Sequence, residues 1–164
     1  MLSFKEFLQE KYGTTGTYAA LKFDQPSTDD IEAYQAHNKI PNPVPSDKLH
    51  VTLLYSRRHM AGFKPRGRLE SLIKARVAGF DVWDTQDGKK ALVARLDAPE
   101  LVARHRELMD KYNGTYDFPE YKPHTTLSYD VGPDFDHQNL PPFGPVLTLD
   151  NEFGEDLDLD WKAD

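Results

Sequence analysis

Residues 50–55 and 124–129 repeat one spacing of histidine, threonine and tyrosine. Their sequences are HVTLLY and HTTLSY, so both read H-x-T-L-x-Y. Because an imidazole has an ordinary pKa of about 6.5, His50 and His124 can occupy different protonation states near neutral pH. One can then accept a proton from an attacking hydroxyl or water while the other donates a proton to the leaving oxygen. The repeats therefore predict acid–base cleavage of a phosphodiester that requires no metal ion or other cofactor.

Each repeat is predicted to be a β-strand that presents its histidine and threonine to a cleft. Both repeats are rich in β-branched and aromatic residues, and both follow a proline-containing turn. Because side chains alternate along a strand, His50 and Thr52 share one face, as do His124 and Thr126. The apolar residues between them suit a core. The threonine hydroxyls can donate hydrogen bonds to phosphate oxygens as charge builds up in a transition state.

Other interpretations of the histidines carry less weight. A single His-x-Thr has little specificity, since a histidine on a strand is more often structural or exposed, but the repeated six-residue pattern is much more specific. A metal site is a weaker alternative, because the chain has no cysteine and its spacing suggests no third ligand. His37, His59, His105 and His137 lack the motif context. For His105, on the apolar side of a predicted helix, we expect a core position.

The composition is that of a single soluble domain. The chain has 164 residues, of which 38% are hydrophobic and 29% charged, as in a typical globular protein. We therefore expect one domain spanning residues 1–164. The sequence contains no apolar run long enough to cross a bilayer, and its charged N-terminus lacks the apolar core of a signal peptide. We accordingly expect a cytoplasmic protein with no membrane partner.

The charge of the chain is unevenly distributed. The net charge is −7, and segment 150–164 is strongly acidic. Long nucleic acids are bound mainly through neutralisation of their phosphates, so this acidity argues against such a partner. Segment 57–76, directly after the first repeat, is instead rich in arginine and lysine. It could attract an anionic ligand, or it could equally be a solvent-exposed helix and loop.

The elements around the repeats suggest two related lobes. Helical periodicity and capping residues predict helices over 3–12, from Ser27 onwards, around 69–75 and from Pro99 to Tyr112. Strands are predicted over 17–23, 77–85, 91–96 and 146–153. Asp87-Gly88 predicts a hairpin turn. Because each repeat follows a strand and a helix, the order indicates an internal duplication. We therefore expect the two histidines to face one another across a groove.

The paired motifs resemble those of the two-histidine (2H) phosphoesterases, and the order of elements agrees over most of the chain. The resemblance implies an α+β, bilobed fold in which two pseudo-symmetric antiparallel-sheet lobes with flanking helices surround a central cleft. It also implies that His50 and His124 are the acid–base pair. Thr52 and Thr126 would then be the pair that orients the phosphate.

Within that superfamily, residues 1–23, the motif spacing and the acidic tail carrying Trp161 resemble the phage anti-CBASS nucleases. That family implies degradation of 3′,5′-linked cyclic di- and trinucleotides, such as 3′,3′-cyclic GMP-AMP, which bacteria use as antiviral alarms. It also implies base-binding residues outside the motifs, and the positions that match are Tyr12, Trp83, Glu152 and Trp161. Aromatic faces stack on bases, and a carboxylate accepts hydrogen bonds from exocyclic amines. Trp83 could instead be a core residue, and Trp161 a C-terminal anchor.

Two further functions are compatible with the same residues. One is a 2H enzyme that acts on RNA ends or on 2′,3′-cyclic phosphates. The other is a non-catalytic module that sequesters cyclic nucleotides. The second is disfavoured, because a binding module has no need of a pair of proton-transfer groups.

Overall fold

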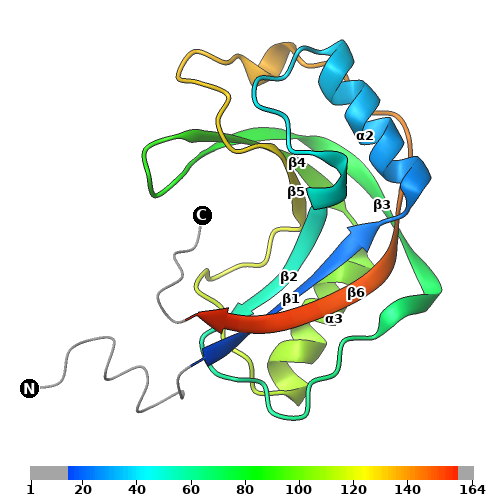
Figure 1. The fold of residues 1–164 in the computed structure, drawn as a ribbon, viewed down its shortest axis with the longest axis vertical. Coiled ribbons are helices and arrows are strands. Elements are labelled where there is room, and N and C mark those ends of the chain that lie inside the picture. The colour runs from blue at the N-terminus through cyan, green and yellow to red at the C-terminus, as the bar shows by residue number, and fades with distance from the viewer. Residues whose placement is uncertain (1–14, 159–164) are drawn as a thin grey trace, which may run out of the picture.

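In the computed structural model, which describes residues 15–158, the strands pair into an antiparallel sheet (Figure 1). Its strands are β1 (Thr15–Phe23), β2 (His50–Ser56), β3 (Gly67–Asp84), β4 (Lys90–Asp97), β5 (His124–Ser128) and β6 (Leu147–Asp158). The order across the sheet is β2-β1-β6-β3-β4-β5. The two repeats are therefore the strands at its two opposite edges. The predicted α+β class with antiparallel strands and flanking helices is confirmed.

Side chains join these two edge strands where the curved sheet brings them together (Figure 1). The Thr125 hydroxyl of β5 donates to the carbonyl of His50 at 2.9 Å. The Tyr121 hydroxyl, just before β5, donates to the carbonyl of Thr52 at 2.8 Å. An edge strand leaves alternate backbone groups without ladder partners, and these contacts supply partners for two of them. They hold the two repeats side by side.

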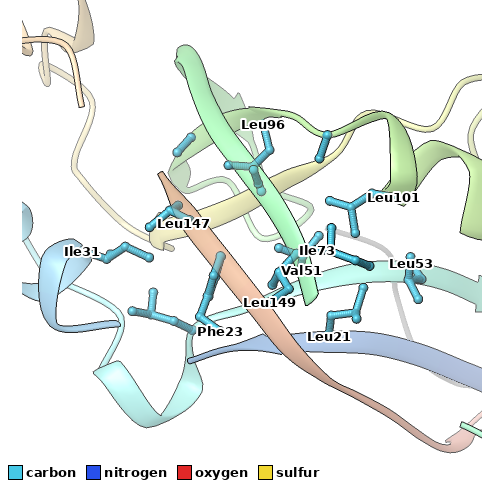
Figure 2. Packing of buried hydrophobic residues seen from close by; sticks show 14 of the residues in the cluster. Leu21, Phe23, Ile31, Val51, Leu53, Ile73, Leu96, Leu101, Leu147 and Leu149 are labelled. Carbon is cyan, nitrogen blue, oxygen red and sulfur yellow. The ribbon is translucent and has the colours of Figure 1, made fainter. Parts of the chain in front are cut away.

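The core lies against the face of β2 that does not carry His50 and Thr52. Val51 of β2 and Leu149 of β6 join one apolar cluster with Ile31 and Leu101. Figure 2 shows Ile31 of α2 (Gln25–His37) on the left of this cluster, and Leu101 of α3 (Pro99–Lys111) on the right together with Leu53 of β2. Because neighbouring residues of a strand point to opposite faces, packing Val51 into the core turns His50 and Thr52 away from it.

The helix predicted from Ser27 begins earlier than expected. The side chain of Asp24 caps α2 by accepting a hydrogen bond from the amide of Ser27 at 3.0 Å, and Pro26 occupies the first turn. Ser27 is buried, and its hydroxyl accepts from the amide of Thr148 in β6 at 2.8 Å. The residue predicted to cap the helix therefore links it to the sheet.

The helix predicted around residues 69–75 is wrong, because this segment belongs to β3. Leu69 and Ile73 are both buried, and their spacing of four residues is typical of a helix face. A spacing of four residues is also two full alternations of a strand, so it suits one face of β3 equally well. The pairing of β3 with β6 in addition shifts register between Arg68 and Ile73. Such an irregularity changes which residues face the core.

The other predicted elements within residues 15–158 are present, with ends that differ by a few residues except in β3, which begins at Gly67 instead of residue 77. Strands were expected over 17–23, 77–85, 91–96 and 146–153, and these are parts of β1, β3, β4 and β6. Gly88 has a positive φ of 81°, as a tight hairpin turn requires. The predicted helix over 3–12 lies outside the described residues. No helix within residues 15–158 is long and apolar enough to cross a membrane.

A buried ion pair fixes α3 to the sheet. Arg104 is 6% exposed and Glu152 of β6 is 1% exposed. The Arg104 guanidinium donates from Nε to Oε2 of Glu152 at 2.9 Å and from Nη2 to Oε1 at 2.7 Å. The amide of Arg66 also donates to Oε1, at 3.1 Å. Both carboxylate oxygens of Glu152 are therefore engaged inside the protein.

Removing one partner of this ion pair should destabilise the fold. We expect Glu152→Ala to lower the free energy of unfolding by about 3–5 kcal/mol, because it leaves a buried guanidinium without its bidentate acceptor. Glu155→Ala, at an exposed position of the same strand, should change it by no more than about 0.5 kcal/mol. Urea denaturation measures both. Equal losses in the two variants would contradict a structural role for the pair.

Candidate active site

One cleft is lined by the histidines and threonines of both repeats. His50 and Thr52 come from β2, and His124 and Thr126 come from β5. The cleft is narrow, with a volume of about 50 Å³. Strands at opposite edges of the sheet thus place four polar side chains around a space that suits a single phosphate group. The expectation that the two histidines face one groove agrees with this arrangement.

Each imidazole is held by a backbone carbonyl two residues earlier. Nδ1 of His50 lies 2.8 Å from the carbonyl oxygen of Lys48, and Nδ1 of His124 lies 2.8 Å from that of Lys122. Because a carbonyl oxygen can only accept, the proton of each neutral imidazole resides on Nδ1. Nε2 of each ring is then free to accept a proton, or to donate one when the ring is charged. Both rings are prepared for proton transfer in the same way.

The surroundings of His124 favour its neutral form. Burial lowers the pKa of His124 below the ordinary histidine value, and positive charge on His50 lowers it further, while the hydrogen bond to Lys122 acts in the opposite direction. The rings of Trp83 and His124 also pack edge-on, with their centroids 4.5 Å apart. A neutral imidazole beside the cleft is suited to accept a proton.

Both repeats contain an irregularity at the same position, which strict alternation does not predict. In the pairing of β2 with β1 the register skips Leu53, and in the pairing of β5 with β4 it skips Leu127. The extra residue in each strand turns the following side chains to the other face. Tyr55 and Tyr129 consequently line the cleft with the histidines. The repeated tyrosine in the motif was the signal for them, but alternation alone would have placed Tyr55 on the opposite face from His50.

The two threonines differ in their surroundings. Thr52 is 9% exposed, and its hydroxyl lies 3.1 Å from the hydroxyl of Tyr18 and 3.4 Å from that of Tyr55. The Thr126 hydroxyl makes no hydrogen bond to another residue within 15–158. Tyr18 comes from β1, and no motif in the sequence indicated it. The site is therefore less symmetric than the repeats.

His105 contacts the backbone of the first repeat. Its Nδ1 lies 2.6 Å from the carbonyl oxygen of Leu53, the residue that the register skips. Its ring stacks on Tyr121 at a centroid distance of 4.3 Å, and Tyr121 in turn donates to the carbonyl of Thr52. The predicted core position of His105 is wrong, because its side chain is half-buried. It instead contacts the backbone of β2 at the carbonyl of Leu53. Burial lowers its pKa.

The four predicted base-binding residues have different outcomes. Trp83 lines the cleft beside His124, so it is available to a ligand, and its binding role stays a prediction. Glu152 lies in the buried ion pair with Arg104, and the prediction that it contacts a base is therefore wrong. Tyr12 and Trp161 lie outside the described residues.

The arginines and lysines of segment 57–76 are not among the residues that line the cleft. Arg57 forms a salt bridge with Asp117 at 2.8 Å, and Arg66 forms one with Glu107 at 3.2 Å. The structure therefore favours the solvent-exposed interpretation of this segment. Within residues 15–158, His, Asp and Glu side chains do not gather in a group of three or more that could hold a metal ion.

The fold is similar to those of several solved structures, one of which is described as a phosphoesterase. A crystal structure of E. coli LigT in complex with phosphate superposes with a TM-score of 0.55 at 15% sequence identity, covering 85% of both chains. LigT in complex with 3′-AMP gives a TM-score of 0.51 at 16% identity, covering 89% of this chain and 95% of that one. At this identity the likeness concerns the fold alone.

Sequence comparison gives a closer relationship. A family model described as anti-CBASS protein Acb1 matches residues 15–164. The anti-CBASS protein Acb1 of Vibrio phage KVP40 is 37% identical over 164 residues, covering 99% of this chain and 98% of that protein. The Acb1 protein of Enterobacteria phage T4 is 39% identical over 167 residues, covering 100% and 99%. Because these matches extend over nearly the full length of both partners, the chain belongs to the anti-CBASS protein Acb1 family.

Proposed function

We propose that this protein is a metal-independent phosphodiesterase that opens 3′,5′-linked cyclic di- and trinucleotides. The observation that carries the proposal is the pair of imidazoles, each held through Nδ1 by a backbone carbonyl, in the lining of one narrow polar cleft. Membership of a family named for action against CBASS supports a cyclic nucleotide substrate. The site of action would be the cytoplasm of the host bacterium, where such messengers are made.

The reaction would use the ribose 2′-hydroxyl next to the reacting phosphate. Nε2 of His124, kept neutral by burial, accepts the proton of that hydroxyl as its oxygen bonds to phosphorus. The bond from phosphorus to the 5′ oxygen breaks, and His50 in its charged form donates a proton to that oxygen. Thr126 and Thr52 donate hydrogen bonds to the non-bridging oxygens. The ring opens to a linear nucleotide with a 2′,3′-cyclic phosphate and a 5′-hydroxyl.

Cleavage should depend on both histidines and on no metal ion. Cleavage of 3′,3′-cyclic GMP-AMP in excess EDTA should proceed at the rate seen without chelator. His50→Ala and His124→Ala should each lower kcat by about 100-fold or more, because each removes one positioned proton transfer. Product formation is followed by chromatography.

The matched control is His37→Ala, since His37 is exposed on α2 and is not in the lining of the cleft. It should cleave at the wild-type rate. Loss of activity on chelation, or full activity in both motif variants, would contradict the mechanism. Binding without any product would support the sequestering module, and a preference for 2′,3′-cyclic phosphates would support the rival 2H enzyme.

Cleavage should also depend on pH through the protonation of His124. If His124 must be neutral to act as the base, kcat/KM falls only when the pH drops through its lowered pKa. The acid limb of the profile should therefore lie below the ordinary histidine value of about 6.5. Steady-state kinetics across the acid and neutral range measures it. A midpoint at or above that value would assign the base role elsewhere.

A further inference from the structure

A second, wider cavity adjoins the cleft. Its volume is about 350 Å³, within the range of about 300–1,000 Å³ that small-molecule sites occupy. Five residues line both spaces, and they are Thr52, Tyr55, Trp83, Asp84 and His124. A ligand whose phosphate lies between the histidines can therefore extend into the wider cavity without leaving the protein surface.

One wall of this cavity is aromatic and already in place. Phe118 is exposed at 43%, so its ring is accessible from the cavity that it lines. Its ring packs edge-on against Tyr116 with centroids 5.6 Å apart. Tyr116 in turn packs edge-on against His105, at 4.8 Å, and His105 is anchored to the backbone of β2. A held aromatic surface can stack on a base with little loss of side-chain entropy.

The charges of the cavity point to a second phosphate. Among the described residues that line either space, Lys122 is the one lysine or arginine. It is exposed, and it makes no ion pair with a carboxylate within residues 15–158. Of the two acids in the lining, Asp84 is paired with Lys90, and Glu120 is exposed to solvent. Lys122 is therefore free to bind an anion.

We propose that this cavity binds the nucleotide that does not react, with Phe118 stacking on its base and Lys122 bound to the second phosphate of the ring. The inference rests on the proposed function, because a cyclic dinucleotide carries a second base and a second phosphodiester that a single-phosphate substrate lacks. It explains why a lysine lies beside a site whose histidines need only one phosphate. It also assigns ring recognition to residues outside the H-x-T-L-x-Y repeats.

The test compares steady-state kinetics with 3′,3′-cyclic GMP-AMP. Phe118→Ala and Lys122→Ala should each raise KM by about tenfold, with kcat changed by no more than about twofold, because these contacts are the same in ground and transition states. Lys122→Arg should retain a near wild-type KM. Added salt should raise the KM of the wild type more than that of Lys122→Ala.

The control variants are Leu72→Ala and Lys64→Ala. Leu72 is an exposed apolar residue of β3, and Lys64 is an exposed lysine that makes no ion pair within 15–158; neither lines the cavity. Both controls should keep the wild-type KM. The inference is overturned if the Phe118 and Lys122 variants match these controls, or if they lose kcat with KM unchanged. Failure of the wild type to cleave this substrate would instead reject the proposed function.

Discussion

The hydrogen bond from the Thr125 hydroxyl to the His50 carbonyl is the contact on which the site depends. The strands that carry the two histidines lie at opposite ends of the strand order and share no ladder. Side-chain hydrogen bonds must therefore join these two strands, as backbone hydrogen bonds join neighbouring strands elsewhere in the sheet. Thr125 does so from the face of β5 opposite to His124 and Thr126, so the residue between these two in one repeat holds the other repeat in place.

The same constraint explains the aromatic surroundings of the site. Tyr121 and His105 occupy the carbonyls of Thr52 and Leu53, which an edge strand would otherwise leave to solvent. These two side chains cover one side of β2, and Tyr116 extends the aromatic surface by packing against His105. His124 is itself partly buried, and this burial lowers its pKa. A nearly symmetric sequence pattern has acquired an asymmetric environment.

Much of this could be predicted from residue patterns. Alternation placed His50 and Thr52 opposite Val51, and Pro99 with an apolar periodicity placed α3, because both depend on neighbours in the chain. Patterns failed where a spacing suited both a helix and a strand, and where a register break intervened. The spacing of Leu69 and Ile73 imitated a helix, and the skipped residues Leu53 and Leu127 turned Tyr55 and Tyr129 towards the cleft. The prediction that Glu152 contacts a base was wrong for a different reason. Its ion-pair partner Arg104 is distant in sequence, so no local pattern indicated the pair.

The sequence by itself determined the chemistry available to this protein: two imidazoles and two hydroxyls at a spacing that one strand face can present, in a chain without thiols. Tertiary structure decided which of these groups line one cleft and which tautomer and protonation state they favour. Only folding brings the two edges of the sheet together, selects the tautomer of each imidazole through a carbonyl, and lowers the pKa of His124. These properties depend on distances and burial between segments far apart in the chain, which local patterns do not encode.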